Sequence, residues 1–270
     1  MPADLALHGC GPTAAVNSFV FLQNKFPAVY GKMLVPELPR NDPANDLNGD
    51  GDVDQTDDMI AVANVLAGQE FMKTICAGCA TSKSTFRYDF MDGKKKYIES
   101  KVPKKTSYAA QDSPALAAFP NLKPDFAKRE DPTWQFLRDN LMTAEDVEIL
   151  LTLFNPDGTE KAGHYVTVTN IKWTDGDMDG IIDAGEGATL GVIDPNSGMF
   201  KEYGLFQDPT TMRLIVKYPT KTGLLDVTIT AAVKESYIPE PGTLSLLAVG
   251  LLACGVIRRR RAAGGGNTGS

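Results

Sequence analysis

Cys10 is the residue best placed to do covalent chemistry. It lies in HGCGPT at residues 8–13, directly before an apolar stretch that predicts a helix over residues 13–25. Pro12 suits the first turn of that helix, where its missing N–H costs nothing. A thiol at a helix N-terminus faces unpaired backbone N–H groups and the positive end of the helix dipole, and both favour the thiolate. Cys10 is therefore a candidate nucleophile that needs a base beside it.

The chain has two histidines, so few bases are available. His8 is a poor partner because a residue two positions from Cys10 has unsuitable geometry for proton transfer. His164 begins a predicted strand over residues 163–171, and Asp194 ends another over 188–194. If these strands pair as an antiparallel hairpin, residue 194 falls opposite roughly residue 167. We expect Asp194 to orient the imidazole of His164 toward Cys10.

A family resemblance rests on these same residues. CGPTAA at 10–15, GHYV at 163–166 and IDP at 193–195 resemble papain-like cysteine peptidases related to bacterial double-glycine leader peptidases. The resemblance covers most of residues 1–235. It implies Cys10 as nucleophile, His164 as general base and then acid, and Asp194 as the orienting group. That family usually carries a glutamine about six residues before the cysteine as an oxyanion donor. Here the position is Asp4, an acceptor.

Two Asp-rich loops have the spacing of calcium-binding loops. Residues 46–57 and 175–186 each place oxygen ligands at positions 1, 3, 5, 9 and 12, with glycine at position 6 for the sharp turn. Position 7 of each would contribute its backbone carbonyl. Two structural calcium ions are therefore expected. The predicted ligands are Asp46, Asn48, Asp50, Asp52, Asp54 and Asp57 in the first loop, and Asp175, Asp177, Asp179, Ile181, Asp183 and Glu186 in the second.

The first loop, with a helix predicted over residues 58–70, resembles a single dockerin repeat inserted at residues 42–70. Dockerins carry two such repeats close together, and the second loop here lies far away in the sequence, which disfavours a cohesin-binding role. The second loop joins two predicted strands. Calcium there would pin the hairpin that carries His164 and Asp194.

The C-terminal region contains three features in a fixed order. Pro239-Glu240-Pro241 is followed by an apolar segment at residues 243–257 and by four arginines at 258–261. This order resembles the PEP-CTERM sorting signal, which implies processing by an exosortase. Residues 237–261 are assigned to the signal and 262–270 to a tail. The apolar segment predicts a transmembrane helix whose arginines stay cytoplasmic, with the preceding chain outside. An exported chain needs a signal peptide, so the true start is expected upstream of Met1.

Composition narrows the function classes further. The net charge of −7 argues against general nucleic-acid binding, and four cysteines are too few for a disulfide-stapled scaffold. Cys76 and Cys79 have CxxC spacing without the second pair that a zinc site needs, so a small disulfide is the favoured interpretation.

The remaining sequence predicts helices before strands. A hairpin is predicted over residues 84–99 around Met91-Asp92-Gly93, and surface loop over 100–131. Helices are predicted at 134–141 and 144–154, the second because Thr143 and Asp146 have capping-box spacing. Strands follow at 163–171, 188–194, 211–218 and 224–233. We therefore expect an α+β, papain-like peptidase domain over residues 1–236, with an N-terminal nucleophile helix on an antiparallel sheet and a C-terminal transmembrane sorting helix.

The sequence therefore predicts an exported, calcium-stabilised cysteine peptidase that hydrolyses peptide bonds in a peptide or protein substrate. An exosortase would sort it to the cell surface or extracellular matrix, after anchoring in the membrane through residues 243–257. Two alternatives stay open. One is a catalytically silent, calcium-binding matrix protein. The other is an acyl-transfer or transglutaminase-like enzyme that uses the same three residues.

Overall fold

The computed structural model describes residues 9–74, 85–114, 123–143, 145–176, 178, 182, 186–220 and 223–239. The chain divides into a large unit, residues 1–236, and a C-terminal unit, residues 237–270. Only residues 237–239 of the second unit are described. The account below therefore concerns the first unit.

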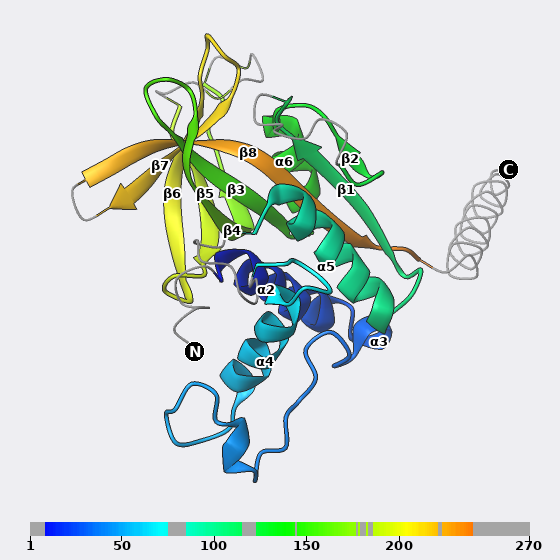
Figure 1. Cartoon of the computed structure of the whole chain (residues 1–270). Helices are drawn as coiled ribbons and strands as arrows, with labels where there is room; N and C mark the ends of the chain where they lie inside the picture. Colours follow the sequence, from blue (N-terminus) through cyan, green and yellow to red (C-terminus); the bar gives the residue numbers. More distant parts are fainter. Residues whose placement is uncertain are drawn as a thin grey trace, which may run out of the picture. The chain divides into compact units, whose positions relative to one another are not determined.

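Six antiparallel strands form a closed barrel at the centre of this unit (Figure 1). The ring closes because β8 pairs with both β7 and β3. Two further strands, β1 and β2, extend the sheet beyond β8. The strands are β1 (Thr106–Asp112), β2 (Ala127–Lys128), β3 (Val147–Phe154), β4 (Glu160–Lys172), β5 (Ala188–Asp194), β6 (Met199–Gln207), β7 (Leu214–Thr220) and β8 (Gly223–Tyr237).

Side-chain alternation separates two hydrophobic cores. Ile149 and Leu151 on β3 point into the barrel, where they join inward residues such as Val166 of β4. Leu150 and Tyr165 belong instead to the core between the barrel wall and the helices. Because β3 is buried on both faces, its sequence is an almost continuous apolar run and not a polar alternation.

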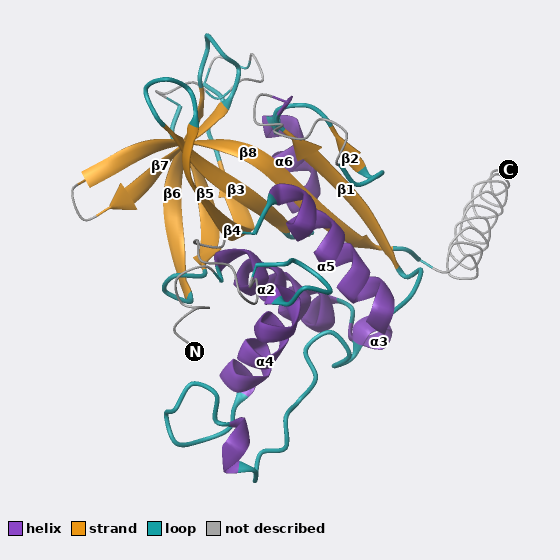
Figure 2. Cartoon of the chain, viewed as in Figure 1, coloured by secondary structure: helices purple, strands orange, loops and turns teal. Residues whose placement is uncertain are grey.

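One helix, α2, packs on the outer wall of the barrel, and α4 and α5 pack against α2 (Figure 2). The first, α2, packs mainly against β4 and α4, and α6 places Trp134 and Leu137 in the barrel core. The helices are α2 (Cys10–Lys25), α3 (Pro27–Tyr30), α4 (Gln55–Ala67), α5 (Arg87–Lys101) and α6 (Trp134–Met142), with a short 3-10 helix at Pro43–Asn45.

The predicted fold class is wrong. The protein is not a papain-like α+β fold with a transmembrane sorting helix, because its sheet closes into a six-stranded antiparallel barrel. Closure depends on the length of β8, whose first half pairs with β7 from Gly223 and whose second half pairs with β3 up to Lys234. A strand prediction gives the length of β8 but not its two partners.

The predicted transmembrane segment lies outside the described residues. Among the described residues, none of the helices has the length and hydropathy that a bilayer-spanning segment requires. Residues 243–257, where the transmembrane helix was predicted, lie outside the described residues, as does the tail at 262–270.

Several element predictions are confirmed and others are wrong. The helices predicted at 13–25, 58–70 and 134–141 correspond to α2, α4 and α6, and the strands predicted at 163–171 and 188–194 lie in β4 and β5. The helix predicted at 144–154 is instead strand β3. The surface loop predicted at 100–131 contains β1 and β2, and β6 was not predicted at all.

The hairpin predicted at 84–99 is helix α5, and Gly93 explains the error. Asp92-Gly93 has the composition of a tight turn, yet Gly93 lies inside the helix where another segment crosses it. A Cβ atom there would lie 2.6 Å from the backbone carbonyl carbon of Phe71. The glycine therefore serves close packing of two backbones and not a turn.

We predict that Gly93→Ala destabilises the protein by about 1–3 kcal/mol, because backbone atoms of Phe71 must move to admit the methyl group. Urea unfolding followed by circular dichroism measures the change. Gly204→Ala is the matched control, since its Cβ would lie an ordinary 3.5 Å from the Lys217 side chain. Equal midpoints for Gly93→Ala and the wild type would contradict the prediction.

Candidate active site

Cys10 is the first residue of α2, and two contacts hold that helix end on the barrel. The Thr167 hydroxyl of β4 donates a hydrogen bond of 2.9 Å to the Ala14 carbonyl. The next residue, Gly11, packs so closely that a Cβ atom would lie 2.8 Å from the Thr85 hydroxyl oxygen. The thiol of Cys10 is free and partly buried. Its position on the barrel wall is thus fixed by the first turns of α2.

His164 and Asp194 lie together on the inner side of the barrel at one end. Thr167 pairs with Ile193 in the β4–β5 ladder, within one residue of the predicted register. His164 Nε2 is 3.0 Å from Asp194 Oδ1. The carboxylate is buried, whereas the imidazole is 17% exposed. Because Nε2 donates to Asp194, Nδ1 is the nitrogen left for the thiol.

Cys10 and His164 interact closely enough for each to shift the pKa of the other. Burial alone would raise the pKa of Cys10, but the hydrogen bond and charge of His164, with backbone N–H groups of Tyr165 and Gly11, lower it below its usual 9.0. Burial alone would lower the pKa of His164, yet its hydrogen bonds with Asp194 and Cys10 raise it to about 9. Both shifts favour the thiolate–imidazolium ion pair over the neutral thiol and imidazole.

Asp194 is held by an unusually large set of donors. Its backbone neighbour Asn196 donates an N–H to Oδ1 at 2.9 Å. The other oxygen, Oδ2, accepts from Tyr203 Oη at 2.7 Å, Lys201 Nζ at 3.0 Å and Tyr218 Oη at 3.5 Å. Burial would raise the pKa of Asp194, but His164 and these donors hold it well below its ordinary value. The orienting group therefore stays ionised.

Lys201, Tyr203 and Tyr218 were not predicted as site residues. Tyr203 and Tyr218 pack edge to face, and the Tyr218 ring also meets the edge of the His164 imidazole. Period-two alternation places them on the inner face of β6 and β7, in line with Leu205 and Val216. The period-two alternation in the sequences of β6 and β7 could have placed these tyrosines on the inner face. It could not have placed them beside Asp194 without the register of these strands relative to β5.

The first predicted calcium loop, residues 46–57, is fully described. Its carboxylates accept backbone N–H groups of the loop itself: Asp46 from Gly49 and Gly51, and Asp57 from Leu47 and Asn48. Asp54 and Asp57 also form the capping box of α4. Gly51, at position 6, has a φ of 101°, as the sharp turn requires. The residue types and the turn match the sequence pattern of a calcium loop, but among the described residues no three carboxylates of this loop place oxygen atoms within 4.8 Å of one another.

The second predicted calcium loop is described only in part. Asp175 and Glu186 stand at its two ends, and the Gly176 N–H donates to Glu186 Oε1 at 2.8 Å. Asp177, Asp179, Ile181 and Asp183 lie outside the described residues. So do Asp4, His8, Cys76, Cys79 and Cys254. The predictions on those residues therefore stay predictions.

A cavity of about 560 Å³ lies at the opposite end of α2 from Cys10. It is lined by residues that include Gln23, Asn24 and Arg40. A helix rises about 1.5 Å per residue, so this cavity is roughly 20 Å from the thiol. It does not belong to the Cys10 site.

The comparison with known families identifies the C-terminal segment. Residues 238–261 match the PEP-CTERM protein-sorting motif, which confirms the predicted sorting signal. The motif supports exosortase-dependent sorting to the cell surface, with an exosortase as processing partner. No curated protein and no solved structure matches the chain. The peptidase and calcium-loop resemblances find no support in these comparisons.

We predict that His164→Ala slows alkylation of Cys10 by iodoacetamide at pH 7 by tenfold or more. Loss of the imidazolium removes the main groups that lower the thiol pKa, and each pKa unit changes the thiolate fraction about tenfold. The rate is measured by peptide mass spectrometry across pH 5–10, where the midpoint should shift upward. Lys172→Ala, an exposed change on the same strand, is the control. Superimposable pH profiles for wild type and His164→Ala would refute the ion pair.

Proposed function

We propose that the protein is a surface-sorted cysteine hydrolase that cleaves peptide bonds through a Cys10 acyl-enzyme. The observation that carries the proposal is that His164 lies 3.0 Å from the Asp194 carboxylate and also interacts with the Cys10 thiol. A nucleophile, a base and an orienting carboxylate come from three separate segments, in the arrangement that acyl transfer uses.

The geometry assigns a role to each group. The Cys10 thiolate attacks the substrate carbonyl carbon, and the imidazolium of His164 donates its proton to the departing amine nitrogen. The neutral imidazole then takes a proton from water, which attacks the thioester and releases the acid. Asp194 stays ionised, fixing the ring with Nε2 protonated and stabilising its positive charge. Partial exposure of the imidazole leaves the reacting groups within reach of substrate.

The same groups support transfer to an amine in place of water, because the acyl-enzyme is common to both reactions. The first chemical step is therefore identical for a hydrolase and for a transglutaminase-like enzyme. Hydrolysis is the simpler proposal since water is always present. A silent matrix protein, in contrast, would need neither the lowered thiol pKa nor the ionised carboxylate.

We predict that peptide hydrolysis by the full chain is abolished by Cys10→Ala and unchanged by Cys76→Ala. The activity should fall above pH 9, because His164, with its pKa of about 9, then lacks the proton for the leaving amine. It should also fall at acid pH as Cys10 gains a proton. Cleavage of a peptide library with mass-spectrometric detection measures this, and a peptide aldehyde tests formation of a covalent adduct.

The outcomes separate the three candidates. Amide products that appear only with an added primary amine would favour acyl transfer over hydrolysis. Absence of cleavage, of amide products and of a covalent adduct for the wild type would leave the silent matrix protein. A cleaving chain whose Cys10→Ala variant still cleaves would place the chemistry elsewhere.

We also propose that residues 46–57 and 175–186 each hold a structural calcium ion. The positive φ of Gly51 supports the first site, and the spacing of ligands in the sequence supports both. The ion would neutralise the acidic loop and fix the entrance to α4. No catalytic step passes through it.

We predict that calcium raises the melting temperature of the full chain and that Asp46→Asn with Asp50→Asn removes part of this rise. At a free concentration of about 100 times Kd, one site contributes about 2.7 kcal/mol. That corresponds to roughly 5–10 °C for a unit of this size. Calorimetry with calcium and with EDTA measures the effect, and Asp42→Asn is the control outside the loop. A calcium-dependent rise that is identical in the loop variant would exclude the first site.

A further inference from the structure

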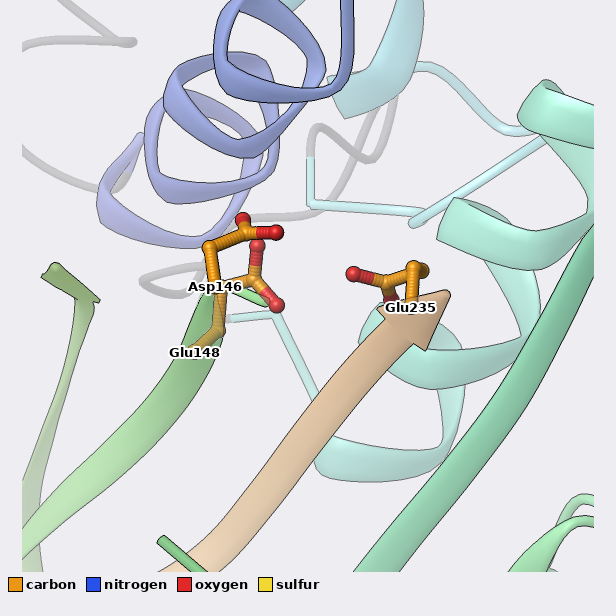
Figure 3. A group of neighbouring side chains, drawn as sticks. All are labelled: Asp146, Glu148 and Glu235. Carbon is orange, nitrogen blue, oxygen red and sulfur yellow. The ribbon is translucent and has the colours of Figure 1, made fainter. Parts of the chain in front are cut away.

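Three carboxylates lie close together in the space between the outer wall of the barrel and the helices (Figure 3). Asp146 lies directly before β3, Glu148 lies near the start of that strand, and Glu235 comes from the end of β8. Each offers an oxygen atom within 4.8 Å of the others. All three side chains are buried, with at most 1% exposed. We call these residues the acidic triplet.

One ammonium lies against the acidic triplet. Lys94 Nζ forms ion pairs with Glu148 Oε1 and Glu235 Oε2, and it donates to Ser18 Oγ at 3.0 Å. Lys94 is fully buried. If all three carboxylates were ionised, they and the ammonium would carry a net charge of −2, which a protein interior offsets either by protonating a carboxylate or by binding a cation.

Asp146 is the member that the lysine does not pair. Both of its oxygen atoms are buried and have no hydrogen-bond partner among the described residues. One oxygen atom of each glutamate, Glu148 Oε2 and Glu235 Oε1, is also buried without a hydrogen-bond partner among the described residues. Figure 3 shows the Asp146 and Glu148 carboxylates side by side, facing Glu235. Four buried acceptor atoms without donors thus belong to groups that meet at one point.

We infer that the acidic triplet binds one divalent metal ion of the oxygen-preferring class, such as calcium, magnesium or manganese. The charge of such an ion balances the triplet and Lys94 to zero. Oxygen ligands lie about 2.0–2.6 Å from these ions, so oxygens on opposite sides of one ion are up to about 5 Å apart, as in this cluster. The donor set contains no nitrogen or sulfur ligand, which disfavours zinc and copper.

The ion would join four elements that are distant in the sequence. Its ligands lie in or directly before β3 and in β8, while Lys94 and Ser18 bring α5 and α2 to the same point. Because the carboxylates are inaccessible, the ion enters as the protein folds and then exchanges slowly. This site is separate from the two loop sites and does not depend on the function proposed for Cys10.

The test uses the full chain with both loops disabled by Asp46→Asn, Asp50→Asn, Asp175→Asn and Asp177→Asn. The protein is folded with calcium, magnesium or manganese alone, passed through EDTA and analysed for metal by mass spectrometry. We expect one retained ion per chain with at least one of these metals, released when urea unfolds the protein. Absence of a retained ion for all three metals overturns the inference, whatever the variants do.

Asp146→Asn on the same background tests the direction in which the melting temperature changes. Glu145→Gln is the control at the adjacent residue. With a metal site, the variant loses the retained ion and melts at a lower temperature than its parent. Without a metal, the change removes a buried, unpartnered charge, so the variant melts at the same or a higher temperature, which overturns the inference. Circular dichroism and Cys10 alkylation report whether the variant is folded.

Discussion

Burial of the Lys94 ammonium is the constraint on which the arrangement of this protein depends. An ion moved from water into a core costs several kcal/mol unless it is paired. Lys94 meets that requirement with Glu148 of β3, Glu235 of β8 and Ser18 of α2. Burial alone would lower the pKa of Lys94, but the carboxylates hold it above its ordinary value. The charge therefore fixes α5 and α2 against two particular strands, whereas apolar packing alone would tolerate some sliding.

His164 and Asp194 lie on the inner face of the neighbouring strands β4 and β5, and Cys10 is on α2. Glu148 pairs with Thr167 across the β3–β4 ladder, and Leu151 pairs with His164. Thr167 points outward to the backbone of α2, while His164 points into the barrel with Asp194. Side chains alternate between the two faces of β4, so residues three positions apart have different roles. Thr167 positions the helix that carries the Cys10 thiol, and His164 is the base for that thiol.

The proximity of His164 and Asp194 could be predicted from the sequence, whereas closure of the barrel could not. His164 and Asp194 belong to neighbouring strands, so their proximity follows from a local ladder. The barrel closes through the pairing of β8 with β3, and Lys94 meets Glu235 in the same way across a long stretch of sequence. A period-two pattern reveals neither of these long-range contacts. Thr143 and Asp146 have the spacing of a helix cap, yet Asp146 belongs to a buried cluster. Lys94 stands in a run of three lysines that has the composition of solvated surface.

The position of β8 gives the protein a mechanical property. The sorting motif begins at residue 238, directly after β8 ends at Tyr237, so a tether at that end of the chain pulls along this strand. The first half of β8 is hydrogen-bonded to β7 and its second half to β3. In the sheet, β1 lies on the opposite side of β8 from β3. Tension along the strand therefore loads many hydrogen bonds together in shear and does not open them one at a time. The strand that closes the barrel is thus also the one suited to bear load at a cell surface.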